Sequence, residues 1–179
     1  MEISSPLLSW FDFNKRDLPF RKNRDAYRIW VSEIMLQQTR VETMIPYYNN
    51  WIKNYPGITS VYKSNESSLL KSWEGLGYYS RCRNFHKAAK IVCEEYNGMI
   101  PDSWDDFRSL PGVGDYTAGA VLSIAFNKPF IALDGNVKRV MARILGRKKI
   151  SKYNIQRFIS TLKKWLDRDR PGDFNEAMI

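Results

Sequence analysis

Two carboxyl groups, those of Glu33 and Asp134, lie in sequence contexts that suit acid catalysis and the stabilisation of positive charge. Glu33 lies in a helical segment that is apolar nearly all round, and it shares one face with Ile29, Trp30 and Leu36. Burial there is expected to raise the pKa of the carboxyl group and to keep a proton available near neutral pH, as a general acid requires. A structural salt bridge to an arginine explains the same burial equally well.

Asp134 belongs to a different segment, Leu133-Asp134-Gly135-Asn136, which leads into a basic helix. Taken alone, this aspartate is best interpreted as the N-cap of that helix, although a capping residue can also be a catalytic carboxylate. One protonated and one ionised carboxyl group are the pair that cleaves a glycosidic bond. The first activates the leaving group, and the second stabilises, or bonds to, the sugar cation.

A tight turn at residues 110–114, Leu-Pro-Gly-Val-Gly, separates two expected helices. Pro111 ends the first helix, while Gly112 and Gly114 permit positive φ and a close backbone approach. We expect the outward amides of the turn, with the N-terminus of the next helix, to bind a DNA phosphate without regard to sequence. An ordinary αα-hairpin is the alternative. The small residues after Tyr116 (Thr-Ala-Gly-Ala) permit close helix packing and favour DNA binding.

We expect these residues to lie on helices or on the turns between them, because apolar residues recur at intervals of three and four positions and strand patterns are scarce. We therefore predict an all-α protein, with Asn97-Gly98 and Gly146 as helix ends and Asn65, Asp102 and Asp173 as N-caps. The expected helices cover residues 7–13, 27–39, 41–54 (with a kink or restart at Pro46), 58–62, 66–73, 78–96, 104–110, 116–126, 137–145, 154–166, and a last segment after Asp173.

The composition is that of a folded, basic protein. Its 179 residues are 44% hydrophobic, which suffices for one core or for two small lobes. The 28 Lys and Arg against 19 Asp and Glu suit a protein that meets a polyanion, although a membrane surface or an acidic protein would explain the charge equally well. A basic run that suits a phosphate track comprises Lys138, Arg139, Arg143, Arg147, Lys148, Lys149 and Lys152.

The cysteine pattern and the absence of long apolar runs indicate an intracellular protein. Cys82 and Cys93 have neither CxxC spacing nor nearby histidines, so we expect no disulfide and no metal site. We find no secretory h-region and no run of 18 apolar residues. We therefore expect a soluble protein that is located in the cytoplasm or the nucleus, is not secreted and has no membrane partner. We expect His86 to be solvated or near a phosphate. Core or lobe-packing positions are expected for Trp51, Trp73, Trp104 and Trp165.

Several motifs in order resemble the helix-hairpin-helix (HhH-GPD) DNA glycosylases, and within them the MutY-type adenine DNA glycosylases. The likeness runs nearly end to end. Besides the turn at 110–114 and the segment 133–137, its carriers are Leu18-Pro19-Phe20-Arg21, the segment from Val31 to Thr39, Gly75-Leu76-Gly77-Tyr78-Tyr79-Ser80-Arg81 and Phe174-Asn175-Glu176-Ala177-Met178. The one mild departure among them is Phe20, where the family usually has Trp.

The resemblance implies roles for most of these residues. Glu33 would protonate adenine at N7 with the help of water, Asp134 would stabilise the sugar cation, and Asn136 and Tyr116 would complete the acid and sugar environment. Tyr116 stands where strand-cutting relatives carry a nucleophilic lysine, so we expect a monofunctional enzyme. The base pocket would include Phe20, Arg21, Leu36 and Glu176, and the DNA contacts would include Gln38, Tyr78, Leu110, Gly112, Val113, Gly114, Lys138 and Arg139.

Such an enzyme must also flip its target nucleotide, and Leu36, Gln38 and Tyr78 have side chains suited to wedging into the gap. We expect a monomer that binds double-stranded DNA containing a mismatch or an oxidised base. The given chain stops at Ile179, before the family's four cysteines and its carboxy-terminal domain. We expect no cofactor within the chain, and a [4Fe–4S] cluster only if the protein continues with those cysteines. Without those parts, we expect weaker DNA binding and poorer discrimination of the partner base.

The resemblance also implies a layout of two helical lobes. A six-helix barrel would span residues 27–128, residues 1–26 and 129–179 would form the second lobe, and the active site would lie in the cleft. Three alternatives stay open: a thymine (G:T mismatch) glycosylase of the same superfamily, a non-catalytic helix-hairpin-helix DNA-binding module, and a basic helical adaptor for other proteins.

Overall fold

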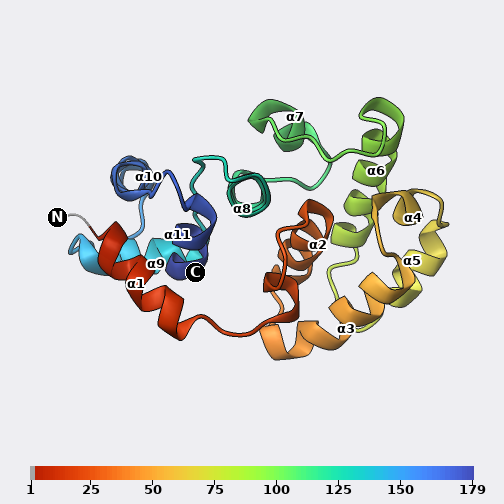
Figure 1. Cartoon of the computed structure of the whole chain (residues 1–179), viewed down its shortest axis with the longest axis horizontal. Coiled ribbons are helices and arrows are strands. Elements are labelled where there is room, and N and C mark those ends of the chain that lie inside the picture. Colours follow the sequence, from red (N-terminus) through yellow and green to blue (C-terminus); the bar gives the residue numbers. More distant parts are fainter. Residues whose placement is uncertain (1–2) are drawn as a thin grey trace. The chain divides into compact units, whose positions relative to one another are not determined.

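The computed structural model describes residues 3–179, and within them every regular element is helical. This confirms the predicted fold class. The elements in chain order are α1 (Ser4–Asn14), the 3-10 turn η1 (Pro19–Arg21), α2 (Ala26–Leu36), α3 (Val41–Asn54), α4 (Ile58–Tyr62), α5 (Glu66–Ser72), α6 (Ser80–Glu95), α7 (Trp104–Ser109), α8 (Asp115–Phe126), α9 (Gly135–Ile144), α10 (Lys152–Trp165) and α11 (Pro171–Met178) (Figure 1).

Contacts divide the chain into two units, which we name the terminal unit (Met1–Arg16 and Asp115–Ile179) and the middle unit (Asp17–Gly114). The observed division falls after Arg16 and before Asp115, whereas the predicted boundaries lay at 26/27 and 128/129. Helix α8 therefore groups with the terminal segments and not with the segment predicted as the barrel. Its packing against α11 explains that grouping. The predicted six-helix barrel itself stays a prediction.

The middle unit is built around aromatic side chains. Trp30 of α2 is fully buried, and its ring makes edge contacts with Phe85 of α6 and Phe107 of α7, each at a centroid distance of 4.9 Å. Trp51 of α3 meets Trp73 edge-on at 5.4 Å. Helices α4 and α5 pack on α6, and α3 packs on α2 (Figure 1). The prediction that Trp51 and Trp73 are core residues is confirmed.

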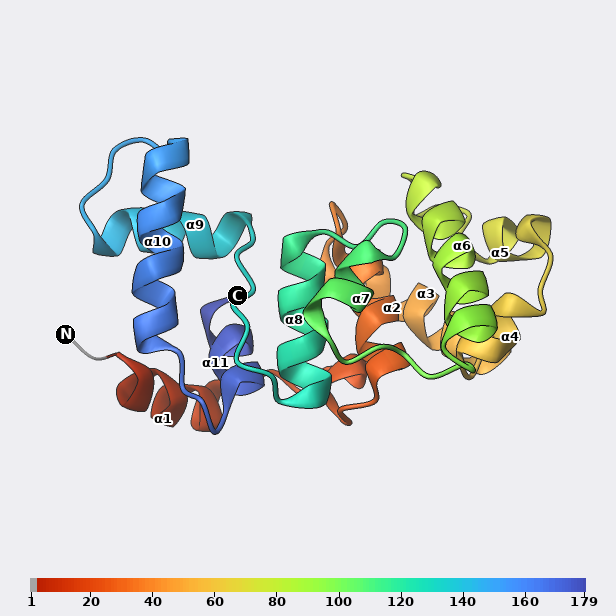
Figure 2. The ribbon, with the colours of Figure 1, turned by 90° about the horizontal axis from the view of Figure 1, so that it is seen from above.

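The terminal unit has its own apolar core, formed by α9, α10, α11 and α1. Helix α10 crosses α9, and the two meet through buried residues such as Met141 and Phe158 (Figure 2). Phe174 of α11 is fully buried in the same cluster, and Trp165 packs against the edge of the cluster. The other tryptophan predicted to pack, Trp104, belongs to the middle unit and is half-buried there. Helix α1 completes the unit by packing on α11.

The helix caps agree with the sequence at some positions and differ at others. Asn65 caps α5 by accepting the amide of Ser68 at 2.8 Å, as predicted. The cap of α7 is Ser103 rather than Asp102, because the Ser103 hydroxyl accepts the amide of Asp106. Asp173 is also not a cap: it lies inside the first turn of α11, where its carboxylate pairs with Arg170 at 2.8 Å. Helix α3 continues through Pro46 instead of restarting there.

Candidate active site and nucleic-acid interface

Glu33 is buried on α2, as its apolar neighbours predicted. The helix begins at the cap Asp25, whose carboxylate accepts the amide of Arg28 at 2.8 Å. Within it Trp30 and Met35 are fully buried, and Glu33 itself is 8% exposed. The structure thus confirms that Glu33 is a buried residue of the middle unit, and its role as an acid stays a prediction.

Helix α2 ends at Leu36, three residues before the predicted end at Thr39. Gln37 is extended, and Gln38 has a φ of 61°, in the left-handed region that non-glycine residues seldom occupy. The guanidinium of Arg81 binds the carbonyl oxygens of Ile34 and Gln37, which a longer helix would have used internally. A distant side chain therefore ends the helix and leaves Gln38 exposed.

A second turn in the middle unit presents Tyr78. Gly75 and Gly77 have positive φ values, and so does Tyr78 at 47°, so α6 begins at Ser80 and not at the predicted residue 78. Gly75 suits its φ of 98°, a conformation that residues with a side chain rarely adopt. The Tyr78 side chain is 62% exposed. Residues in strained backbone conformations gather at functional sites, which suits a contact with DNA.

The turn at residues 110–114 is anchored from within the middle unit. Leu110 and Val113 are buried, the Val113 amide donates to the carbonyl of Leu110 at 3.1 Å, and Arg108 donates to the carbonyl of Val113 at 2.7 Å. We expected the amides of this turn to face outward, which is wrong for Val113. Leu110 and Val113 hold the turn, and the surface it offers is the backbone around Gly112 and Gly114.

Gly112 has a φ of 80° and lies against α6, where an added Cβ would be 2.8 Å from the Cβ of Asn84. Beside it is a cavity of about 200 Å³, lined by residues that include Gln37, Ser80, Arg81 and Asn84. The cavity therefore joins the end of α2, the start of α6 and the turn. No pattern in the sequence indicated a role for Asn84 or for the individual side chain of Arg81.

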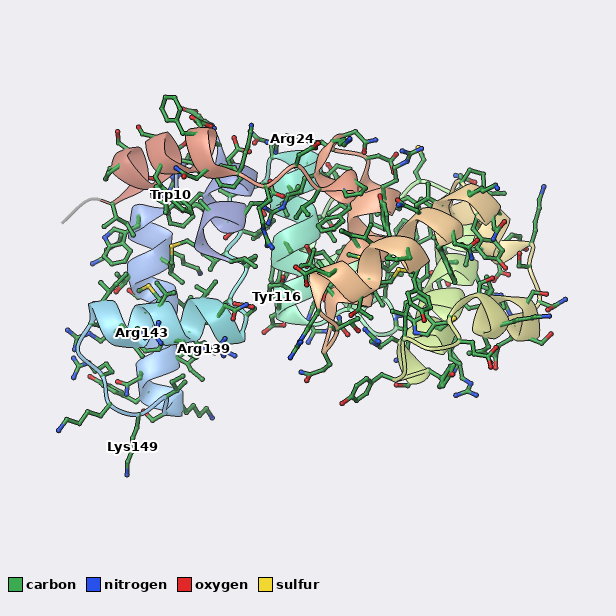
Figure 3. All side chains as sticks on the ribbon, turned by 90° about the horizontal axis from the view of Figure 1, so that it is seen from below. Trp10, Arg24, Tyr116, Arg139, Arg143 and Lys149 are labelled. Atoms are coloured by element: carbon green, nitrogen blue, oxygen red, sulfur yellow. The ribbon has the colours of Figure 1, made fainter. Side chains whose placement is uncertain are left out.

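Asp134 caps α9 in the terminal unit, as predicted. Its Oδ1 atom accepts the amide of Val137 at 2.7 Å, and the residue is half-buried. Asn136 is exposed and accepts a hydrogen bond from Arg139. Tyr116 is half-buried on the first turn of α8 (Figure 3). Oδ2 of Asp134 is not needed for the cap, so one residue can cap a helix and serve a substrate.

Two small features hold the segment before Asp134 in place. Gly119 of α8 lies so close to this segment that a Cβ would be 2.1 Å from the carbonyl oxygen of Ile131. Asn175 of α11 accepts the amide of Ala132 at 3.0 Å and donates to the carbonyl of Phe130 at 2.8 Å. The small residues after Tyr116 thus permit a close approach, here to the irregular segment before Asp134. Asn175, noted in the sequence only as part of a motif, is a positioning residue.

The four predicted base-pocket residues belong to both units. In the middle unit η1 packs on α2, which brings Phe20 and Arg21 beside the helix that carries Glu33. Phe20 is 7% exposed and meets Tyr48 edge-on at 5.8 Å, so it acts as a packed wall. Leu36 is half-buried at the end of α2. Glu176 is half-buried on α11 of the terminal unit.

Positive charge is concentrated in the α9–α10 segment of the terminal unit. Ten of the chain's 28 Lys and Arg residues fall between residues 135 and 166, a stretch without Asp or Glu. The rest of the chain contains the other 18 Lys and Arg residues and all 19 Asp and Glu residues. Arg139 and Arg143 lie on α9, and Lys149 extends from the following loop (Figure 3). Lys138 is half-buried on the first turn of α9. This segment therefore accounts for the net charge of the molecule.

The remaining reactive groups have structural surroundings. Cys82 is buried, which raises its pKa to about 12, and Cys93 is a half-buried free thiol. His86 is 4% exposed, so the expectation of a solvated histidine is wrong; burial on α6 lowers its pKa. Across residues 3–179 no three His, Cys, Asp or Glu side chains are grouped as metal ligands, and the two cysteines do not fit a four-thiolate cluster.

None of the helices in the described part of the chain is both long and apolar enough to span a membrane.

Proteins named as adenine DNA glycosylases are similar to this chain over nearly its whole length. An adenine DNA glycosylase of Buchnera aphidicola (subspecies Baizongia pistaciae) is 41% identical over 97% of this chain and 50% of its own length. The human adenine DNA glycosylase is 42% identical over 97% of this chain and 34% of its own length. The chain thus spans half or less of the length of these two relatives.

Solved structures share the fold. A thermostable thymine-DNA glycosylase superposes with a TM-score of 0.89 at 27% identity, covering 98% of this chain and 82% of its own. An endonuclease III in a trapped covalent complex with DNA reaches a TM-score of 0.80 at 24% identity, covering 98% and 80%, and shows a common fold. The family model for HhH-GPD superfamily base excision DNA repair proteins matches residues 31–165. With three quarters of its length matched, this chain belongs to the HhH-GPD superfamily of base excision DNA repair proteins.

Proposed function

We propose that this chain carries the chemistry of a monofunctional adenine DNA glycosylase, which hydrolyses the N-glycosidic bond of adenine opposite 8-oxoguanine or guanine and starts base excision repair. The observation that carries the proposal is the burial of Glu33, a residue that is 8% exposed and has apolar neighbours along α2. Its surroundings suit an acid that gives its proton to a base. The choice of adenine is supported by the names of relatives at 41% and 42% identity.

Each carboxyl group has one task in the reaction. Glu33 protonates adenine at N7 with the help of water, so that the base departs with the electrons of the N-glycosidic bond. Asp134 uses Oδ1 for the amide of Val137, which leaves Oδ2 to stabilise the positive charge that develops on the sugar. Water then adds to the cationic sugar carbon and loses a proton to solvent, which leaves the abasic sugar. Asn136 and Tyr116 support the carboxyl groups and the sugar.

Double-stranded DNA with a mismatch or an oxidised base is the partner that the surface suits. The backbone around Gly112 and Gly114 would hold one phosphate, and Lys138 and Arg139 would neutralise others. Gln38 and Tyr78 are exposed on strained turns, where they can enter the space beside a flipped nucleotide. Arg21, Leu36 and Glu176 would contact the base itself.

The position of Tyr116 predicts base removal without strand cleavage. A strand-cutting enzyme needs an amine that forms a Schiff base with the sugar, and a phenol cannot do so. Incubation of an adenine·8-oxoguanine duplex with the protein should therefore leave the strand whole until hot alkali cleaves the abasic site. Trapping with borohydride should give no covalent complex.

The test measures base release by the native protein and by two variants, with the enzyme in large excess over the DNA. Glu33→Gln keeps the size of the side chain and removes its proton-transfer function, and Asp134→Asn keeps the cap and removes its charge. Each should slow base release by about 10² to 10⁴. Glu42→Gln, an exposed residue on α3, is the matched control and should react normally. If the native protein binds the duplex and releases no base, it is a DNA-binding module instead.

A thymine glycosylase acting on G·T mismatches is a second candidate, because the structure superposes on a thymine-DNA glycosylase with a TM-score of 0.89. A guanine·thymine duplex run beside the adenine substrates separates the two. Faster release of thymine than of adenine would reassign the substrate while leaving the chemistry of Glu33 and Asp134 intact.

A further inference from the structure

Arg81 is a buried cation whose recorded hydrogen bonds all go to main-chain carbonyl oxygens. It lies on the first turn of α6 and is 9% exposed. One terminal nitrogen, Nη1, donates to the end of α2 at three carbonyl oxygens: those of Ile34 at 2.7 Å, Met35 at 3.0 Å and Gln37 at 2.5 Å. A cation at a helix C-terminus also meets the negative end of the helix dipole.

The other terminal nitrogen, Nη2, reaches a different segment. It donates to the carbonyl oxygens of Leu76 and Gly77, each at 3.2 Å. The guanidinium carbon lies 5.4 Å from the ring centroid of Trp73 and 5.6 Å from that of Tyr78. One planar group is thus bonded to the end of α2 on one side and to the turn before α6 on the other.

This arrangement is costly, which argues against an incidental contact. Burial lowers the pKa of the Arg81 guanidinium, and its Nε atom is buried without a hydrogen-bond partner within residues 3–179. Removing a charge from water is unfavourable unless several polar groups replace the solvent. Ending α2 alone would require only the carbonyl oxygens of that helix, so the bonds to Leu76 and Gly77 need a separate reason.

Both segments lead directly into a strained, exposed residue. The bonded carbonyl of Gln37 precedes Gln38, whose φ is 61°, and the bonded carbonyl of Gly77 precedes Tyr78, whose φ is 47°. Left-handed conformations at such residues persist only where the surroundings enforce them. Arg81 fixes the peptide on the amino side of each of these two residues.

We propose that Arg81 is a positioning residue that fixes the spacing between the Gln38 and Tyr78 turns, so that the two side chains engage one step of the DNA duplex together. The contact with DNA rests on the proposed function, whereas the link between the two turns does not.

Two substitutions at Arg81 and one control test the link. Arg81→Lys keeps the charge but has one nitrogen, which cannot reach both sets of carbonyl oxygens at once. Arg81→Gln keeps an NH₂ donor and removes the charge. Arg83→Lys is the control, since Arg83 lies on the same helix, is exposed and pairs with Glu66 at 3.3 Å. Far-ultraviolet circular dichroism identifies the variants that fold.

The first measurement needs no DNA. Amide hydrogen exchange should accelerate in Arg81→Lys at residues 36–39 and 75–79 together, with little change in α3, and should be unaltered in Arg83→Lys. Acceleration at one turn only would overturn the link. Failure of both Arg81 variants to fold would assign the residue to general stability and would also overturn the proposal.

The second measurement places 2-aminopurine beside the mispair in the opposing strand, where unstacking raises its fluorescence. Arg81→Lys should lose the fluorescence rise and about tenfold or more in kcat/KM, whereas Arg83→Lys should stay within about twofold of the native protein. In a Gln38→Ala, Tyr78→Ala background, Arg81→Lys should have little further effect, because its action passes through those two side chains. An equal loss in that background would overturn the proposal. If the native protein releases no base, the proposed function fails, and the hydrogen-exchange result still decides the link.

Discussion

The side-chain amide of Asn175 donates a 2.8 Å hydrogen bond to the hydroxyl of Ser123, and this bond ties α11 to α8 where both residues are buried. The same amide group donates to the carbonyl of Phe130, and its oxygen accepts the amide of Ala132. One asparagine therefore holds two helices and the irregular segment that leads to Asp134. The position of Asp134, the proposed catalytic carboxylate, therefore depends on Asn175, a buried residue that anchors the segment before it.

Asn175→Ala should destabilise the protein by about 2 to 3 kcal/mol, because it leaves buried donors and acceptors without partners. It should also slow base release, since the segment before Asp134 loses its anchor. Urea unfolding and single-turnover assays measure the two effects. Asn49→Ala, an exposed position on α3, makes the same chemical change and should cost less than about 0.5 kcal/mol. Equal unfolding midpoints for the two variants would contradict this role.

Substitution of Gly112 by alanine should disturb the turn twice over, through its φ of 80° and through the Cβ of Asn84 at 2.8 Å. We expect a loss of about 2 kcal/mol or more in stability. Gly77→Ala meets only the conformational cost, about 1 kcal/mol, because its φ is 70° but no atom lies within 4 Å. Gly114→Ala has neither problem and should unfold like the native protein.

Thermal or urea unfolding of the three variants gives the order directly. If Gly112→Ala and Gly77→Ala are equally stable, Asn84 does not pack against the turn as described. Gly114→Ala should weaken DNA binding without changing stability, since its methyl group would stand where a phosphate approaches the backbone.

Local rules predicted the helices well because the signals are contained within a few residues. Gly146 ends α9 with a φ of 62°, and the amide of Arg147 reaches back to the carbonyl of Ala142 at 2.7 Å, as the glycine indicated. Asp134 caps α9 through the amide three residues later. Glu33 was recognised from the apolar residues around it. In each case the deciding contact lies within one or two turns of the chain.

Features set by distant contacts could not be predicted. The end of α2 depends on Arg81, which stands 47 residues after Ile34 and whose acceptors are backbone atoms that no side-chain pattern reports. His86 is a polar residue on the buried side of α6, whereas its place on the helix after Tyr78 indicated solvent or a nearby phosphate. The two positive φ values at Gln38 and Tyr78 follow from the same long-range link. The sequence motif contained Arg81 without showing what it binds.

The two thiols should differ sharply in reactivity. Burial raises the pKa of Cys82 to about 12, so its thiolate is scarce in mildly alkaline buffer, whereas Cys93 is half-buried on the same helix. Iodoacetamide should modify Cys93 at least about 100-fold faster, because the thiolate is the nucleophile. Mass spectrometry of the digested protein measures the ratio. Addition of urea should remove the difference, and equal rates in the folded protein would contradict the burial of Cys82.

The α9–α10 segment holds the excess positive charge of the protein. Replacing Arg143, Lys148, Lys149 and Lys152 by glutamine removes four exposed charges from it. If these side chains neutralise DNA phosphates, the dependence of log K on log salt should become shallower by about 3 to 4. Affinity for an undamaged duplex should fall by about 10-fold to 100-fold at low salt.

A matched variant distinguishes local contacts from net charge. Glutamine at Lys53, Lys63, Lys71 and Lys90 removes four exposed charges from the middle unit, so both variants carry the same total charge. Attraction by overall charge alone would weaken binding equally in the two proteins, whereas direct contacts at α9–α10 would reduce the salt dependence only in the first. Fluorescence anisotropy over a salt series gives both slopes, and parallel slopes would show that this segment does not contact the phosphates. Base release at saturating DNA should be unchanged in both variants, because neither touches Glu33 or Asp134.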